Sequence, residues 1–467
     1  MLNYIWLALV VLSVAIGGWN DRLKEVTEGA FDGAKTAVTI ALGLIGVMAL
    51  WLGVMRLAER AGLVQKIARG LQPLMRRLFP DVPRDHPAMG SMVMNMAANM
   101  LGLGNAATPL GLRAMRDLET LNRRPGTATN AMCTFLAINT ASVQLIPTTA
   151  IALLVAAGSK RPTAIVGTAL LATLCAATVG IISVKLLEKL SFFQPTSASP
   201  RDAESAERDL AEPNERKARL QVQGQTPQSG VRPTPAVPDD MLPTEAPLMR
   251  ATNWGRTALA LLGLFFALLF VRMVWPNVFG VLLKLDASPN VFVRAVNALS
   301  LLAIPFLLSF FPVYAATRGL KVYEEFVEGA KEGFGVILKI IPFLVTMLVA
   351  ISMFKGAGGI DLLTRLLTPI LAPLHFPPDL LPLALMRPLS GSATLAILTD
   401  IVHRLGPENI VTLMAATIYG STETTFYVAA VYFGAVGVKQ TRHAIPAGLL
   451  ADLTGVIASV ALCRAVL

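Results

Sequence analysis

The chain alternates between long apolar stretches and short polar ones, with the spacing typical of membrane helices. A helix needs about 20 apolar residues to cross the hydrocarbon core of a bilayer. Stretches near this length run over residues 2–18, 36–56, 128–157, 163–188, 256–283, 291–316, 334–354, 408–436 and 443–465. We therefore predict an all-α polytopic membrane protein with about nine full spans.

Two further apolar segments, 88–112 and 380–400, are broken by glycine, proline and polar residues. These residues free backbone groups that lipid cannot satisfy, so such segments must face protein or a water-filled cavity. Basic residues on both flanks of 88–112 indicate that both flanks are cytoplasmic. A straight span cannot satisfy that condition, and we predict a re-entrant helical hairpin in each segment.

The polar motifs of the first half recur in the second half at one constant offset. Ser142-Val-Gln144, Gly158-Ser-Lys160 and Leu170-Leu-Ala172 correspond to Ser421-Thr-Glu423, Gly437-Val-Lys439 and Leu449-Leu-Ala451. Duplicated membrane proteins often bind solutes and ions between their repeats, near the middle of the bilayer. The interface between the two copies is therefore the place to look for a site.

Charge placement predicts that the two copies face opposite sides of the membrane. The loop 56–86 is rich in basic residues, whereas the equivalent loop 355–378 holds only Lys355 and Arg365. Cytoplasmic loops carry the excess of Lys and Arg. An odd number of predicted spans also separates the equivalent Gly33 and Gly329. We predict two inverted-topology repeats in a bacterial inner membrane, with the N-terminus in the cytoplasm.

The segment 191–250 differs in composition from both flanks. It is rich in Pro, Ser, Gln, Glu and Arg and has hardly any aromatic residue. Such a segment buries too little apolar surface to order itself. We predict a flexible cytoplasmic linker there, between membrane halves at 1–190 and 251–467.

Composition supports the membrane class, since 54% of the residues are hydrophobic and only 15% are charged. Soluble proteins carry about 25% charged residues. The net charge of +10 comes mostly from Lys and Arg beside apolar spans, so the expected partner is the lipid bilayer and not nucleic acid. Histidines and cysteines lack metal-ligand spacing, and no motif of nucleotide hydrolysis or nucleophilic catalysis occurs. We predict no metal, no cofactor and no enzymatic activity.

Glu423 is the sharpest single candidate for function. It lies in an apolar span among the hydroxyls of Ser421, Thr422, Thr424 and Thr425. A carboxylate buried in the bilayer must be protonated, paired or hydrated, and such residues usually mark solute or ion pathways. Gln144 occupies the equivalent position of the first half. The alternative is a helix-packing glutamate held by neighbouring hydroxyls.

The remaining candidates lie in the hairpins and in the polar parts of the repeated spans. Amide side chains donate and accept hydrogen bonds, and the free N–H groups at hairpin tips favour anions. The predicted solute-binding residues are Asn95, Asn99, Gly104, Asn105, Asn139, Thr140, Ser142, Gln144, Arg387, Ser390, Gly391, Ser392, Ser421, Thr422, Glu423, Thr424 and Thr425. For the glycines the alternative is close helix packing, and for Arg387 it is an interfacial anchor.

At these motifs the chain resembles a known family. Leu101–Pro109 with Asn139–Thr149 is similar to spore maturation protein A, and Met386–Ser392 with Gly420–Tyr427 is similar to spore maturation protein B. Both belong to the nucleoside-recognition or gate-domain group, which is distantly similar to concentrative nucleoside transporters and to the gates of ferrous iron transporters. The resemblance implies that this chain fuses two proteins that act elsewhere as a one-to-one pair. It also implies movement of a solute or ion, without identifying which.

Together these features predict a secondary transporter of a small polar or amphipathic solute, with a nucleoside-like molecule as one option. Alternating access would move one hairpin-bearing repeat against the other, and Glu423 would either couple transport to a proton or cation or hold the solute directly. The alternative is a membrane scaffold or signalling component whose polar residues only lock helices together. A homo-oligomer is left open.

Overall fold

The computed structural model describes residues 2–102, 104–193, 253–275, 290–359, 362, 365 and 376–467, and these fold almost entirely into α-helices. Within them the one strand-like pairing is an isolated parallel bridge between Thr127 and Gln440. The all-α class is confirmed. From position 194 onward the predicted linker lies outside the described residues.

The first half contributes eight α-helices to the described structure, followed by the short η1 (Ser191–Phe193). They are α1 (Leu2–Trp19), α2 (Leu23–Arg60), α3 (Leu63–Leu78), α4 (Pro87–Met100), α5 (Gly104–Glu119), α6 (Asn130–Ala141), α7 (Thr148–Ala156) and α8 (Ile165–Leu187). The second half contributes α11 (Asn253–Val274), α12 (Val291–Thr317), α13 (Val322–Gly356), η5 (Pro378–Leu380), α15 (Leu381–Met386), α16 (Gly391–Leu405), α17 (Ile410–Ser421), α18 (Thr425–Gly434) and α19 (Ala444–Val466).

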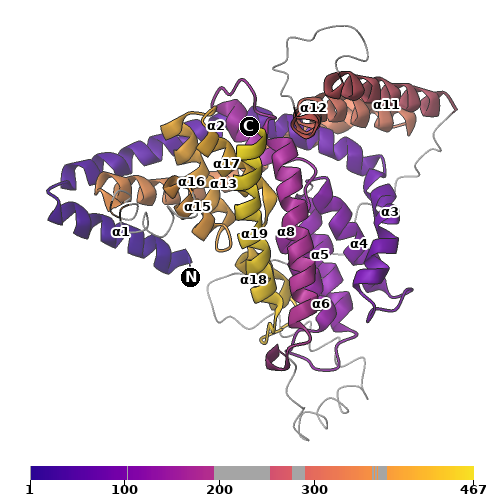
Figure 1. Ribbon diagram of the computed structural model, residues 1–467, viewed down its shortest axis with the longest axis horizontal. Coiled ribbons are helices and arrows are strands. Elements are labelled where there is room, and N and C mark those ends of the chain that lie inside the picture. Colours follow the sequence, from indigo (N-terminus) through magenta and orange to yellow (C-terminus); the bar gives the residue numbers. More distant parts are fainter. Residues whose placement is uncertain are drawn as a thin grey trace, which may run out of the picture.

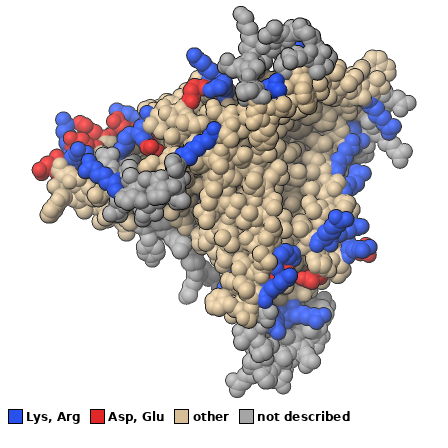
Figure 2. Space-filling model, in the orientation of Figure 1, with Lys and Arg blue, Asp and Glu red and all other residues tan. Residues whose placement is uncertain are grey.

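Among the described helices, α2, α8, α11, α12 and α19 are long and apolar enough to cross a bilayer. Little of the apolar window of α11 is buried among the described residues, and its Leu264 and Phe265 side chains are exposed. Charged side chains gather around the edges of the face in Figure 2, whose centre is uncharged. Because water would solvate such a surface poorly, these helices lie in a membrane.

Two of the predicted spans are divided at their polar residues. The span predicted at 128–157 forms α6 and α7, and the span at 408–436 forms α17 and α18. In the first break Ser142 has the left-handed φ of 33°, and Pro147, which lacks an N–H group, precedes α7. In the second break Thr422 adopts an extended backbone. These four helices are too short to cross a bilayer singly, so neither predicted span is one continuous helix.

Each predicted hairpin segment folds as two helices joined by a tight turn. α4 and α5 pack against each other, and Gly102 has a φ of 75° in the turn between them. α15 and α16 are joined at residues 387–390, where the Ser390 side chain accepts a hydrogen bond from Ala393 N at the start of α16. A left-handed turn suits glycine and an N-cap suits serine, so the broken composition of both segments has a local cause.

α2 and α13 pack closely and run in opposite directions. A Cβ atom on Gly33 would lie 2.6 Å from the carbonyl oxygen of Leu348, and one on Gly329 would lie 2.6 Å from that of Leu52. Leu52 and Leu348 follow the equivalent glycines by the same number of residues. Each helix therefore offers its partner the same kind of contact. Only glycine permits an approach this close.

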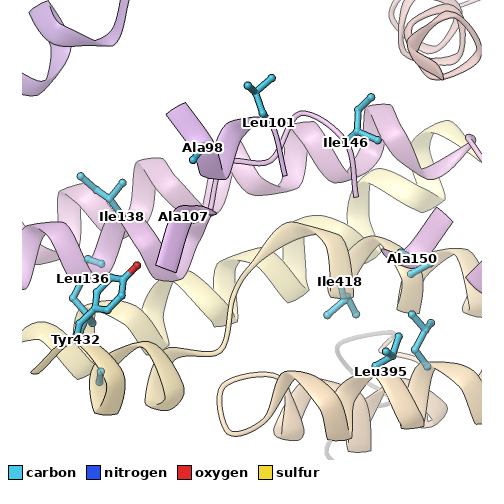
Figure 3. Packing of buried hydrophobic residues seen from close by; sticks show 14 of the residues in the cluster. Ala98, Leu101, Ala107, Leu136, Ile138, Ile146, Ala150, Leu395, Ile418 and Tyr432 are labelled. Carbon is cyan, nitrogen blue, oxygen red and sulfur yellow. The ribbon is translucent and has the colours of Figure 1, made fainter. Parts of the chain in front are cut away.

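α8 and α19 lie side by side at the centre of the molecule (Figure 1). A Cβ atom on Gly180 would lie 3.2 Å from Ala451 Cβ, and one on Gly455 would lie 3.6 Å from Ala176 Cβ. These helices are therefore antiparallel as well. The core around them contains residues of both halves, including Leu136, Ile418 and Tyr432 (Figure 3).

Candidate functional site

The two helix breaks meet each other inside the bundle. The backbone N–H of Glu423 donates a hydrogen bond of 2.7 Å to the carbonyl oxygen of Thr140. The side-chain Nε2 of Gln144 donates to Glu423 Oε1 at 3.3 Å. Both side chains are half-buried. The residues that the sequence pairs by position in the two halves are thus in direct contact.

The first hairpin takes part in an amide cluster. The cluster consists of Asn95 and Asn99 of α4, Asn139 of α6 and Tyr432 of α18. Asn99 Nδ2 donates to Asn139 Oδ1 at 2.9 Å. Asn95 Nδ2 donates to Ala107 O at 2.7 Å and lies 3.3 Å from the Tyr432 hydroxyl. The Oδ1 atom of Asn95 is buried without a hydrogen-bond partner. Three of the predicted residues therefore come together, with one acceptor available to a ligand.

Tyr432 joins this cluster from the other half of the chain, and the sequence did not single it out. Its hydroxyl donates to Asn139 Oδ1 at 3.4 Å, and its ring stacks on Phe135 with centroids 5.8 Å apart. The aromatic residue lies in the apolar helix α18, where its side chain looks like ordinary core. Hydroxyl side chains are common in this stretch, so nothing in the local sequence distinguishes Tyr432 from them.

The second hairpin contributes a buried guanidinium. Arg387 is 3% exposed, and its Nη2 donates to Tyr419 O at 2.9 Å while its Nη1 lies 3.4 Å from Thr424 Oγ1. The guanidinium also lies over the Tyr419 ring, 4.9 Å from the centroid. Arg387 is therefore not a surface anchor. It ties the second hairpin to the break between α17 and α18.

Asp452 on α19 lies beside the break between α17 and α18, although it is not among the site residues predicted from the sequence. Thr425 Oγ1 donates to Asp452 Oδ2 at 2.5 Å, and the residue is 3% exposed. The equivalent residue of the first half is Thr173, whose hydroxyl donates to Ala141 O at 2.8 Å. An acid in an apolar helix was the available signal, and its burial shows that it is not solvated.

Some predicted residues have structural roles. Ser390 caps α16, and its hydroxyl lies 3.3 Å from that of Ser392. Ser421 donates to Ile418 O at 3.0 Å and contacts Ser459. A Cβ atom on Gly391 would lie 3.1 Å from Thr424 Oγ1, so this glycine allows the second hairpin to approach the break.

Other predicted residues keep buried oxygen atoms without a hydrogen-bond partner. These are the hydroxyls of Thr140, Ser142 and Thr422. Gly104 and Asn105 begin α5, but their side chains lie outside the described residues. In the described part of the chain no group of three or more His, Cys, Asp and Glu residues is placed to hold a metal ion.

A cavity of about 260 Å³ lies away from these residues. It is lined by basic residues such as Arg123, Arg124 and Arg442 and by Asp81, and it contains none of the predicted site residues. Two hydrogen bonds of Arg442, to Ala128 O and Asn130 Oδ1, are made inside the protein. The cavity is therefore a feature separate from the crossing of the helix breaks.

Comparison with known proteins decides the family. A family described as "Gate: Nucleoside recognition" matches residues 41–158 and 337–439. Spore maturation protein A of Bacillus subtilis (strain 168) is 48% identical over 182 residues, which cover 39% of this chain and 93% of that protein. The chain belongs to the spore maturation protein A and B family.

Spore maturation protein B of Bacillus subtilis (strain 168) is 45% identical over 165 residues, covering 35% of this chain and 93% of that protein. The two relatives match different halves of the chain, as expected for a fusion. A solved structure, the YdaH transporter of Alcanivorax borkumensis, aligns with a TM-score of 0.42 and 16% identity over 99% of this chain and 96% of its own. The predicted resemblance to the nucleoside-recognition group and to spore maturation proteins A and B is confirmed by the family match and by these two relatives.

Proposed function

We propose that this fused member of the spore maturation protein family is a secondary transporter of a small polar solute. The contact between Gln144 and Glu423, where two interrupted helices meet, carries the proposal. Interrupted helices expose backbone groups and hold polar side chains inside the membrane, which lipid alone would not tolerate. In transporters such breaks bind the solute and coupling ions.

The proposed architecture is a pair of inverted-topology repeats. It is supported by the opposite directions of α2 and α13 and by their equivalent contacts at Gly33 and Gly329. Arg56 at the end of α2 pairs with Glu325 near the start of α13, with Nε and Oε2 3.0 Å apart. These two helix ends thus lie on one side of the membrane. The basic loop after α2 makes that side the cytoplasm of the inner membrane.

The solute would bind between the hairpin turns and the two breaks. The amide cluster supplies donors and the free Oδ1 acceptor of Asn95, while Glu423 supplies an acidic acceptor. Such groups suit a neutral polar molecule with several hydrogen-bonding atoms, and a nucleoside has that chemistry. The family description, nucleoside recognition, points to the same class.

The proposal is tested by uptake into proteoliposomes that contain the purified full chain. We expect one member of a panel of labelled nucleosides and other small polar solutes to accumulate. Glu423→Gln should abolish that uptake, because the amide keeps the hydrogen bond to Gln144 but cannot carry charge. Glu408→Gln removes a carboxylate from a loop and serves as the matched control. Uptake by the Glu423→Gln protein at the wild-type rate would show that Glu423 has no such role.

A membrane scaffold is the second candidate, and the structural roles of Ser390 and Ser421 favour it. Both hydroxyls already have partners within the fold. A scaffold needs no ligand, so the purified protein would show no shift in melting temperature with any solute of the panel. A solute-dependent shift that is lost in Asn95→Ala would exclude this candidate.

A further inference from the structure

α19 approaches the break between α17 and α18 at two glycines that flank Asp452. A Cβ atom on Gly448 would lie 2.8 Å from Thr425 Cγ2 and 3.4 Å from Thr140 Oγ1. One on Gly455 would lie 2.5 Å from Thr422 Cγ2. Asp452 therefore lies where α19 packs against Thr422 and Thr425 of the second break, with Thr140 of α6 beside the neighbouring Gly448.

Several oxygen atoms of this group are buried and lack a hydrogen-bond partner. Thr425 donates to Asp452 Oδ2, but Asp452 Oδ1 and the hydroxyl oxygens of Thr140 and Thr422 have no partner. The Thr422 hydroxyl is nevertheless within reach of the Asp452 carboxyl as a second donor, so in the described structure Thr140 supplies the one oxygen of this group that has no partner at all. Buried oxygens without a donor are unfavourable unless a ligand satisfies them.

The charges around Asp452 do not balance. Arg387 and Glu423 are the charged groups near its carboxyl, so an ionised Asp452 and Glu423 would together face one guanidinium. Within the described structure Arg387 donates hydrogen bonds to Tyr419 O and Thr424 Oγ1, and neither acceptor is a carboxylate. One further positive charge would neutralise the group.

The donor atoms restrict the kind of cation. Carboxylate and hydroxyl oxygens are hard ligands that suit alkali and alkaline-earth ions better than transition metals. The candidate ligands include one carboxylate, that of Asp452, whereas a divalent ion normally binds more than one, so a monovalent ion suits the site better. The last carbonyls of the interrupted α17 add the negative end of a helix dipole.

The first half has no corresponding site. Thr173, which is equivalent to Asp452, donates its hydroxyl to Ala141 O and lies 3.1 Å from Ser142 O. A hydroxyl satisfies the end of α6 directly, whereas a carboxylate has no proton to donate to carbonyl oxygens. The substitution of threonine by aspartate between the halves therefore leaves a place for one cation.

We propose that Asp452, with the hydroxyls of Thr140 and Thr422, binds a single sodium ion or another alkali cation of similar size. The ion lies beside the break that carries Glu423, and it bridges the two halves through Thr140. Its role as coupling ion rests on the proposed transport function, whereas its binding does not.

The test measures the melting temperature of the purified full chain in detergent. Sodium chloride replaces choline chloride at constant ionic strength and pH, with no solute present. A ligand of the folded state raises stability with the logarithm of its concentration once the site is filled. We expect such a rise for the wild type and none for Asp452→Asn. Asp400→Asn, which removes an ion-paired carboxylate at the end of α16, should keep the rise.

Thr422→Val is the second variant, because valine keeps the shape of threonine without its oxygen. We expect it to fold and to bind sodium about tenfold more weakly. A wild-type melting temperature that is independent of lithium, sodium and potassium would overturn the proposal. A dependence on pH alone would also overturn it and assign a proton to Asp452. Sodium binding without solute uptake would contradict only the proposed function.

Discussion

Gln144 donates a hydrogen bond to Glu423, and these two residues occupy equivalent positions in the two halves of the chain. Ala176 and Gly455, which are separated by the same number of residues, also face each other. Where these equivalent residues meet, one half offers an amide and the other an acid. An oriented solute would distinguish them.

Exchanging the acid and the amide tests the pairing. Gln144→Glu alone brings two carboxylates together, and we expect a lower melting temperature at neutral pH because like charges repel. Adding Glu423→Gln restores one acid and one amide. The double variant should recover about 1–2 kcal/mol of the lost stability. If the double variant melts no higher than Gln144→Glu, the side chains do not interact in the folded protein.

The contact between α2 and α13 predicts that alanine is destabilising at one glycine of α13 and tolerated at another. A Cβ atom on Gly329 would lie 2.6 Å from Leu52 O, whereas one on Gly335 would have no atom within 4 Å. Gly329→Ala should lose about 1–3 kcal/mol, because the backbone of α2 must move. Gly335→Ala should be neutral or stabilising, since alanine favours helix. Thermal unfolding in detergent measures both, and equal effects would contradict the close packing.

Glu408 predicts a pH-dependent link between two loops. Its Oε1 accepts hydrogen bonds of 2.7 Å from Ser159 Oγ and from Lys160 N. The hydrogen bond from Ser159 is the main reason why the pKa of Glu408 is lowered from 4.5.

A carboxyl whose pKa is lower in the folded state stabilises the protein above its unfolded pKa, and this contribution is lost as pH falls through the folded value. We therefore expect Glu408→Gln to lower the melting temperature at pH 7 and to have no effect once the pH is well below 4.5. Melting curves of both proteins across this range measure the difference. If the difference in melting temperature between the two proteins grows as the pH falls, the prediction is wrong.

Tyr432→Phe tests the amide cluster. The ring should keep its stacking on Phe135, while Asn95 and Asn139 lose the hydroxyl between them. We expect a loss of about 1 kcal/mol in stability and weaker solute binding. The matched control is Tyr427→Phe, because Tyr427 is exposed on the same helix. Equal solute affinity of the two variants would show that the Tyr432 hydroxyl takes no part in solute binding.

Local signals predicted much of the polar interior. The glycines, prolines and hydroxyls at 88–112, 380–400 and the two repeated motifs interrupt apolar patterns, and such interruptions have few explanations in lipid. The structure divides each of these segments into two helices. The spans at 128–157 and 408–436 are counted as full spans because each has enough apolar residues to cross a bilayer, although polar residues interrupt both at Asn139–Gln144 and Ser421–Thr425.

Contacts between the halves could not be predicted residue by residue. Tyr432 joins the amide cluster from α18, and Asp452 reaches the second break from α19. Both residues lie in apolar helices, and the sequence of such a helix does not show which neighbouring helix each side chain faces. Their roles depend on close approaches at glycines such as Gly448, which involve residues far apart in the chain.

The sequence by itself determined that this is a helical membrane protein of the spore maturation family, with two related halves and polar interruptions in apolar segments. These properties follow from composition, spacing and motifs, which are local. The tertiary structure decided which oxygen atoms remain without partners and which equivalent residues meet, such as Gln144 and Glu423. Those relationships depend on how helices cross, and the crossing is set by the packing of the whole bundle.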